Sequence, residues 1–446
     1  MIGFVGLSHL GINYSLATAA KGFDVIAFDA SPALVTNLGA GKFPIEEPGL
    51  RELFDANRQR IRYTADPHDL SVCELVFVTL DVKTDDSNRS DTAPLLLLIW
   101  QIAPLVAKGA ALVVLSQVKP GFTRRLSAAL LGSSAIAEIY YQVETLIFGR
   151  AVECALHPER YMVGAADPGK PLPATFRRWH ESFGCPVLIM GYESAELAKI
   201  AISFFLASSV STTNLLAEVC ETIGANWSEI APALRLDKRI GPHAYLTPGL
   251  GIAGGNLERD WVTIKRLAEG QEMDAGIVDA WIHSSLHRRD WLARTLQRAF
   301  QKRRVPAGTT TVAVWGLAYK ENTDSIKNSP SLAFLSRIPE CRKQAYDPAV
   351  KLPSDAFPRL EQCANAIVCC RDAGALVIPT PWTEFRQVDV NAVREAMTGR
   401  IILDPFGMLD GEIAAAVGFD YYRLGMPPRF AGGETKRSVA SGQAGI

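Results

Sequence analysis

Short apolar runs alternate with helical stretches through the first 190 residues. The helical pattern is clearest at Ile12–Lys21, directly after the first apolar run. Buried strands that alternate with helices are typical of a parallel, doubly wound sheet. We therefore predict an N-terminal α/β domain over residues 1–190, with strands at Ile2–Gly6, Val25–Asp29, Glu74–Leu80, Ala111–Ser116 and Pro186–Met190.

The pattern changes to helical periodicity in the middle of the chain. Ser194–Ile223 carries apolar residues at helical spacing and predicts one long helix, and Trp261–Arg303 predicts another long helical stretch. A glycine-rich segment, PGLGIAGGNLERD, lies between them. These features indicate a central all-α domain over residues 191–305.

Strand–helix alternation returns after a basic stretch that contains Pro306 and Gly308. The pattern predicts a second α/β domain over residues 306–427, followed by a mobile tail over residues 428–446 that is rich in Gly, Ser and charge. The buried strands expected in this domain are Thr311–Trp315, Asn365–Cys370 and Ile401–Leu403.

Composition and charge exclude several classes of protein. The 446 residues carry a net charge of -1 and are 48% hydrophobic, which gives no basic surface for nucleic acid. The longest apolar run, Ala93–Leu115, is interrupted by Pro94, Gln101 and Pro104 and is predicted to form a helix and a strand rather than a membrane span. We therefore expect a cytoplasmic protein with neither nucleic acid nor membrane as partner.

Eight cysteines lie at irregular spacing, most of them in apolar runs. They form no C-x-x-C pair, and no histidine cluster accompanies them. This usage is typical of reduced core thiols rather than of a metal site, so no metal is predicted.

A glycine turn follows the first predicted strand. Gly6 to Gly11 reads G-x-G-x-x-G with Ser8 at the second glycine. Gly6 allows the tight turn, Gly11 allows the helix to pack close to the strand, and the N–H groups at the helix start can bind phosphate. The alternative interpretation is a glycine turn in an unrelated α/β fold.

An acidic residue completes this pattern. Asp29 ends the second predicted strand, where a carboxylate binds the ribose hydroxyls and disfavours the 2′-phosphate of NADP. The sequence therefore predicts an NAD site and the fold class α/β, with two Rossmann-like doubly wound parallel-sheet domains joined by a central all-α domain with a long helix. The predicted cofactor-binding residues are Gly6, Ser8, His9, Leu10, Gly11 and Asp29.

Ordered motifs along nearly the whole chain resemble the UDP-glucose/GDP-mannose dehydrogenase family. The motifs are FPIEEPGL (43–50), PER (158–160), SAELAK (194–199), RIG (239–241), GLGIAGGNLERD (249–260), WGLAYKENTDSIKNSPS (315–331), AYDP (345–348) and PWTEF (381–385). The resemblance implies oxidation of the C6 hydroxyl of a nucleotide-linked hexose in two NAD-dependent steps, the second through a cysteine thioester. It also implies a homodimer that forms through the long central helix, whereas the sequence alone equally allows that helix to pack within one chain.

The resemblance also implies roles for individual residues. Glu144 matches the glutamate of the catalytic loop, Lys199 the lysine that holds oxyanion charge, and Asp260 the aspartate that assists proton transfer. Arg239 resembles an arginine that reaches the sugar site of a neighbouring subunit, and Lys320 resembles a lysine near the substrate. A base and a fixed positive charge are what hydride removal from an alcohol requires.

The chain departs from the family pattern at residues expected to react with the substrate or to bind it. Asn256 stands where the family motif G-F-G-G-x-C-F-x-K-D has its nucleophilic cysteine, and an amide cannot form the thioester. Gln117 replaces a threonine, Ser203 an asparagine, and Phe406 an arginine. The residues expected to contact substrate are Gln117, Ser203, Arg239, Gly251, Gly254 and Lys320, and those expected at the reacting atoms are Glu144, Lys199, Asn256 and Asp260.

Three hypotheses follow from this combination. In the first, the protein oxidises a nucleotide sugar and either stops at the aldehyde or oxidises its hydrate, with Asn256 as a hydrogen-bond donor. In the second, the same fold acts on a different metabolite or a modified sugar. In the third, the chain is a catalytically silent, NAD-binding regulator. The segment from Glu144 to Arg150 resembles the loop of the family's N-acetylmannosamine branch, which favours an amino sugar.

Overall fold

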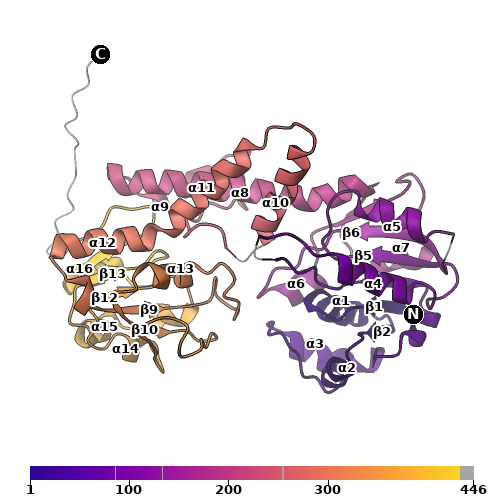
Figure 1. The fold of residues 1–446 in the computed structure, drawn as a ribbon, viewed down its shortest axis with the longest axis horizontal. Helices are drawn as coiled ribbons and strands as arrows, with labels where there is room; N and C mark the ends of the chain where they lie inside the picture. The colour runs from indigo at the N-terminus through magenta and orange to yellow at the C-terminus, as the bar shows by residue number, and fades with distance from the viewer. Residues whose placement is uncertain (86, 133, 254–255, 432–446) are drawn as a thin grey trace, which may run out of the picture. The chain divides into compact units, whose positions relative to one another are not determined.

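The structure, a computed structural model, describes residues 1–85, 87–132, 134–253 and 256–431. The chain divides into two compact units, Met1–Ile202 and Ser203–Ile446, called unit 1 and unit 2. Figure 1 shows a strand-and-helix arrangement at both ends of the chain, which confirms the α/β fold class.

Unit 1 is built on a sheet that has eight strands within the described residues, in the order β3-β2-β1-β4-β5-β6-β7-β8. Neighbouring strands run parallel except for β6 and β7, which are antiparallel. The strands are β1 (Ile2–Val5), β2 (Val25–Phe28), β3 (Ile61–Thr64), β4 (Leu75–Val78), β5 (Ala110–Val114), β6 (Ile136–Gln142), β7 (Tyr161–Ala165) and β8 (Val187–Gly191).

Helices cover both faces of this sheet because alternate residues of its central strands point to opposite sides. Phe4 and Phe77 lie in one core with α1, α3, α6 and α7, whereas Val5 and Val78 lie in the other core with α4 and α5. All four residues of β1, β2 and β4 are buried, as expected for strands covered on both sides. The helices are α1 (His9–Ala20), α2 (Pro32–Gly39), α3 (Leu50–Asn57), α4 (Ala93–Ile102), α5 (Phe122–Leu130), α6 (Ala151–Leu156) and α7 (Ala174–Glu181).

The long helix α8 (Tyr192–Ile223) begins in unit 1 and ends in unit 2, where further helices follow it. The stretch expected as one helical segment over Trp261–Arg303 is divided into three helices, with breaks at residues 270–275 and at Asp290. These helices are α9 (Trp227–Leu236), α10 (Asn256–Glu269), α11 (Gly276–Arg289) and α12 (Trp291–Arg303).

A network of charged and polar groups joins α8 to α11 and α12. The Arg288 side chain is 1% exposed and donates to Glu221 at 2.7 Å. Trp291 Nε1 and the Gly425 N–H donate to the same carboxylate, at 2.8 and 3.0 Å. Because removing one partner of a buried ion pair leaves an uncompensated charge, this network holds the helices in one arrangement.

The second sheet lies in unit 2 and has six strands within the described part of the chain, in the order β11-β10-β9-β12-β13-β14, all parallel. The strands are β9 (Thr311–Trp315), β10 (Arg342–Tyr346), β11 (Leu360–Gln362), β12 (Ala375–Val377), β13 (Ile401–Leu403) and β14 (Asp420–Tyr422). Its helices are α13 (Pro330–Arg337), α14 (Ala366–Cys369), α15 (Val390–Ala396) and α16 (Gly411–Ala416).

One predicted strand is wrong. The run Asn365–Cys370 forms the short helix α14, and the neighbouring strand is β12 instead. The Asn365 side chain accepts a hydrogen bond from Val368 N–H at 2.9 Å and so begins the helix. A run of five apolar residues fits either a buried strand or a short buried helix, and the cap decides between them.

The predicted tail begins with residues that have defined neighbours. Arg429 exchanges backbone hydrogen bonds with Tyr421, and Phe430 packs against Tyr422 with 6.2 Å between ring centroids. The rest of that prediction, residues 432–446, lies outside the described residues.

His180 generates a prediction about stability. It is 2% exposed on α7, its Nε2 lies 2.8 Å from Gln142 Oε1, and burial lowers its pKa to about 3. Between pH 3 and 6.5 His180 is protonated in the unfolded chain but stays neutral in the folded chain. The free energy of unfolding should therefore decrease as the pH is lowered through this window, by up to ~1.4 kcal/mol per pH unit.

Urea unfolding of unit 1, followed by tryptophan fluorescence at pH 7.5, 6, 5 and 4, measures this slope. His180→Gln should flatten it, whereas the exposed control His157→Gln should leave it unchanged. An unchanged slope in His180→Gln would show that His180 does not cause it.

Candidate functional site

The glycine turn joins β1 to α1 at very short range. Gly6 has φ +85°, and a Cβ there would lie 2.9 Å from the Leu80 Cβ. A Cβ on Gly11 would lie 2.4 Å from the Gly6 carbonyl oxygen and 2.7 Å from Thr79 Oγ1. Only glycine therefore fits at both positions, and the first turn of α1 is held against the carboxyl ends of β1 and β4.

Asp29 lies directly after β2, at the same sheet edge. Its Oδ2 accepts a hydrogen bond from Leu7 N–H, and its Oδ1 accepts one from Ser31 N–H, both at 2.9 Å. Each carboxylate oxygen retains a lone pair for another donor, so the carboxylate can still bind a ligand hydroxyl.

Ser8 and His9 contact a residue that the sequence interpretation did not assign. Ser8 Oγ donates to the Thr79 carbonyl at 2.6 Å and accepts from Asp81 N–H at 3.1 Å. The His9 N–H, at the start of α1, donates to Asp81 Oδ2 at 3.3 Å. The Asp81 carboxylate therefore lies at the helix end that the sequence interpretation assigned to phosphate.

Glu47 is a second residue that the sequence interpretation missed, although it lies in the FPIEEPGL motif. Its side chain is 1% exposed, and Oε1 lies 2.8 Å from His9 Nε2. It also accepts hydrogen bonds from Gly149 N–H at 3.1 Å and Ala151 N–H at 3.0 Å. Glu47 thus connects the first turn of α1 to the loop before α6.

Glu144 and Lys199 form an ion pair. Lys199 Nζ lies 2.8 Å from both Glu144 Oε1 and the Glu144 carbonyl oxygen. The second carboxylate oxygen, Oε2, accepts from Leu146 N–H at 2.9 Å. Both side chains are mostly buried, at 13% and 18% exposure, so their charges are screened less than those of a surface pair.

The SAELAK motif positions Lys199 through a buried glutamate. Glu196 is fully buried and accepts hydrogen bonds from Gly121 N–H at 2.6 Å and Thr123 N–H at 2.8 Å, at the start of α5. This contact holds the first turns of α8 against the start of α5, one turn before Lys199.

The other predicted reactive residues belong to unit 2. Asn256 begins α10, and Asp260 lies one turn later with 2% exposure. Gly251 has φ +83°, and a Cβ there would lie 2.4 Å from the Ser285 carbonyl oxygen, so its visible role is close packing against α11. Gly254 lies outside the described residues.

The remaining predicted substrate residues lie on separate elements of the two units. Gln117 follows β5 in unit 1 and is half-buried, and Ser203 lies on α8 one turn after Lys199. Arg239 is 89% exposed and donates to Asp237 at 2.6 Å. The Lys320 ammonium lies 5.7 Å from the Tyr319 ring centroid, in the loop after β9.

A second glycine turn follows β9, and it brings together two further motifs, the one that begins at Trp315 and AYDP. Gly316 has φ +101°, and a Cβ there would lie 2.4 Å from the Thr380 Cβ. The buried Asp347 of AYDP accepts from five donors: the N–H groups of Leu317, Ala318, Ala349 and Val350, and Trp382 Nε1. This carboxylate is saturated and therefore acts in the structure of the turn.

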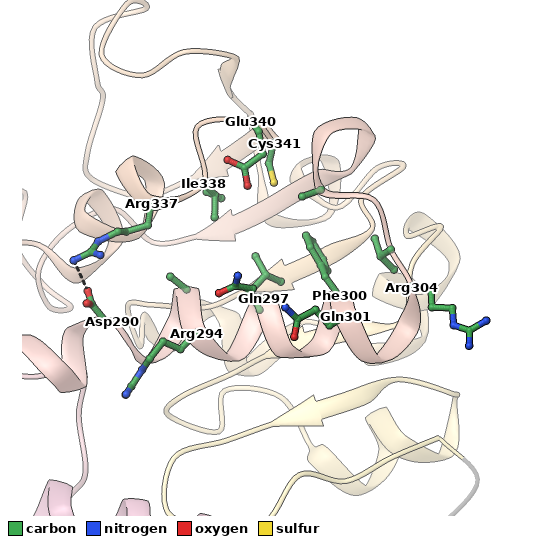
Figure 2. Close-up of a pocket in the computed structure, with 14 residues that line it drawn as sticks. Asp290, Arg294, Gln297, Phe300, Gln301, Arg304, Arg337, Ile338, Glu340 and Cys341 are labelled. Atoms are coloured by element: carbon green, nitrogen blue, oxygen red, sulfur yellow. Dashed lines mark ion pairs between the residues drawn. The ribbon is translucent and has the colours of Figure 1, made fainter.

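A pocket of about 480 Å³ lies in unit 2 between α12 and residues 337–341 (Figure 2). Phe300, Ile338 and Cys341 form part of its lining, and Arg337 pairs with Asp290 at 2.9 Å. Of the site residues predicted from the sequence, none that the structure describes lines this pocket. It is therefore separate from the candidate site.

Three family models match successive parts of the chain. Residues 1–183 match the NAD binding domain, residues 193–285 the central domain and residues 313–411 the UDP binding domain of the UDP-glucose/GDP-mannose dehydrogenase family. The chain belongs to this family. The resemblance noted in the sequence is thereby confirmed, as are NAD as cofactor and dehydrogenase as the class of enzyme.

Relatives match this dehydrogenase along nearly its whole length. It is 28% identical to a UDP-glucose 6-dehydrogenase from Pseudomonas aeruginosa, over 98% of this chain and 99% of the relative. It is 26% identical to a putative UDP-glucose 6-dehydrogenase, YtcA, from Bacillus subtilis, over 95% and 99%. Among solved structures, a UDP-D-ManNAc dehydrogenase from Pyrococcus horikoshii matches with TM-score 0.81 and 22% identity, over 95% and 99% of the two chains.

The first glycine turn of this dehydrogenase suits a dinucleotide in two respects. The close approach at Gly6 and Gly11 leaves the start of α1 facing the sheet edge, and the Asp29 carboxylate lies at the end of β2 with acceptor capacity left for ribose hydroxyls. When bound, NAD would supply the hydride acceptor. The pyrophosphate position is the one at which the chain departs from this pattern, through Ser8 and Asp81.

Glu47 generates a prediction about the site. In Glu47→Gln an amide nitrogen replaces one carboxylate oxygen, so the side chain can no longer accept from Gly149, Ala151 and His9 together. Because hydrogen bonds to a buried charged group contribute about 1.5–3 kcal/mol, we expect unit 1 to lose ~2 kcal/mol of stability.

Thermal unfolding in the presence and absence of NAD checks this expectation. Glu46→Gln is the matched control, since Glu46 is the exposed neighbour and carries the same charge. Equal melting temperatures for the two variants would contradict the role given to Glu47.

Proposed function

We propose that the chain oxidises a primary alcohol of a UDP-linked hexose, at C6, with NAD as the hydride acceptor. The observation that carries the proposal is the partly buried pair of Glu144 and Lys199 in the unit that holds the NAD binding domain. The UDP binding domain over residues 313–411 supports a nucleotide-linked substrate. The named relatives act on UDP-sugars, and the proposal extends that chemistry to this chain.

Glu144 and Lys199 provide complementary functions for this step. The Lys199 ammonium, held by two oxygens of Glu144, is a fixed positive charge that stabilises an alkoxide formed from the substrate hydroxyl. A carboxylate with limited exposure can accept the hydroxyl proton, directly or through water. NAD, when bound, would accept the hydride from the same carbon, and the product would be an aldehyde.

We propose that the second oxidation proceeds without a covalent intermediate, because Asn256 stands where the family pattern has its cysteine. Water would add to the aldehyde to give a gem-diol, and loss of one proton to a base and of one hydride, for which a second NAD would be the acceptor, would leave the acid. The Asn256 amide and Asp260 are proposed to bind and deprotonate this hydrate. If water is excluded, the reaction ends at the aldehyde instead.

The sugar that we propose is an amino sugar. The segment from Glu144 to Arg150 resembles the loop of the family's N-acetylmannosamine branch, and one solved structure with the same fold is named as a UDP-D-ManNAc dehydrogenase. Gln117, Ser203 and Phe406 differ from the usual family residues, which supports a substrate different from UDP-glucose.

We also propose a homodimer that forms through α8. Leu215, Val219 and Ile223 recur every four residues and are 62%, 41% and 68% exposed, so they form an apolar stripe on one face of the helix.

Among the described helices, α8 is also the one long and apolar enough to cross a membrane by length and composition. The central-domain family model includes it, which supports a subunit contact, and the eight free cysteines support a cytoplasmic location.

Product analysis tests the proposed reaction. The purified protein is incubated with NAD and a panel of UDP-linked sugars, and NADH and product mass are measured together. A hydrate route predicts two NADH per sugar, an acid product and no thioester trapped by hydroxylamine. One NADH and a product two hydrogens lighter would show that oxidation ends at the aldehyde.

Lys199→Met is the matched variant for this assay. We expect it to lower kcat by about 10²-fold or more, since it removes the charge that faces the alkoxide. Lys170→Met, which breaks an exposed Lys–Glu pair in the same unit, should keep kcat. Absence of NADH with every sugar would favour a different metabolite or a regulatory role.

Leu215→Glu tests the dimer. A carboxylate buried in an apolar contact costs several kcal/mol, so the variant should elute as a monomer in size-exclusion chromatography with light scattering. Leu97→Glu, on α4 and 71% exposed, is the control that should leave the mass unchanged. A monomeric unsubstituted protein would contradict the proposal.

A further inference from the structure

The start of α1 already carries an anion that belongs to the chain itself. His9 N–H, the first N–H of α1, donates to the Asp81 carboxylate at 3.3 Å. Ser8, the N-cap residue of α1, makes no side-chain hydrogen bond to the helix. Its hydroxyl instead donates to the Thr79 carbonyl and accepts from the Asp81 N–H. The loop after β4 is therefore held at the helix end by three hydrogen bonds.

This position conflicts with the binding of a dinucleotide. The positive end of a helix stabilises negative charge, and its free N–H groups bind a pyrophosphate. With Asp81 in place, a pyrophosphate approaching the same N–H groups meets a like charge. Asp29 already accepts from Leu7 N–H, so two carboxylates flank the turn.

We propose that Asp81 is an internal competitor for the pyrophosphate of NAD, held over the start of α1 by Ser8, and that dinucleotide binding requires its displacement. The proposal rests on the proposed function, in which NAD binds at this turn. Asp81 is an exposed residue on a loop, so rotation of its side chain can release the His9 N–H. The chain thus binds NAD more weakly than the same fold would with a neutral residue at this position.

Calorimetric titration with NAD tests the proposal. Asp81→Asn keeps the shape and an acceptor for the His9 N–H but removes the charge, so NAD should bind at least about tenfold more tightly than to the unsubstituted protein. Ser8→Gly, which releases the loop and returns a glycine to the turn, should also tighten binding. The gain of the double variant should be smaller than the product of the two single gains, because both act on one contact.

Two controls separate this effect from a general change. Asp85→Asn removes the same charge from the same loop, where Asp85 bonds to Arg89 and Ser87, and should leave NAD affinity unchanged. Adenosine, which lacks phosphate, should bind Asp81→Asn and the unsubstituted protein equally. Melting temperatures of all variants are measured to confirm folding.

The outcomes distinguish the two proposals. Equal NAD affinity in Asp81→Asn and the unsubstituted protein, or an equal gain for adenosine, would overturn the role of Asp81. Loss of NAD binding in every folded variant would overturn it as well. Tighter NAD binding in Asp81→Asn with no NADH from any sugar would support Asp81 as competitor and contradict the proposed reaction.

Discussion

The close approach of Gly11 to the Gly6 carbonyl is the contact on which the N-terminal site depends. A methyl group at Gly11 would lie 2.4 Å from that oxygen, so no other residue allows α1 to start this close to β1. Its position over the carboxyl ends of the strands brings Ser8, His9, Asp29 and Asp81 to one sheet edge. The Glu144–Lys199 pair belongs to the same unit but depends on a separate contact, the anchoring of α8 by Glu196.

The chain uses the same turn twice, with different results. In both sheets a glycine with positive φ follows the central strand, and an aspartate after the neighbouring strand accepts the next backbone N–H. Asp347 accepts five hydrogen bonds and is 1% exposed, which leaves it no capacity for a ligand. Asp29 accepts two backbone N–H groups and is half-buried. The number of donors around the carboxylate therefore separates a structural aspartate from one that can bind a ribose.

The sequence predicted those elements whose identity depends on a few neighbouring residues. Continuous apolar runs located the central buried strands, and the glycine turn located the start of α1 to within three residues. The run Asn365–Cys370 forms a helix in place of the predicted strand because a short apolar run fits a helical turn as well as a strand, and the Asn365 side chain caps the helix. Glu47 and Asp81 were missed for a different reason. Their partners lie 38 to 104 residues away in the chain, so their roles exist only in the folded protein.

The contacts of Glu47 have a thermodynamic consequence. One buried carboxylate bonds the His9 ring in the first turn of α1 and the backbone of Gly149 and Ala151, beyond the loop that carries Glu144. A ligand that shifts either segment therefore changes the energy of the other. Coupling of this kind is reciprocal: whatever factor a bound sugar imposes on cofactor affinity, the cofactor imposes on sugar affinity. A cofactor at the start of α1 and a ligand at the Glu144 loop would therefore be coupled through this one side chain.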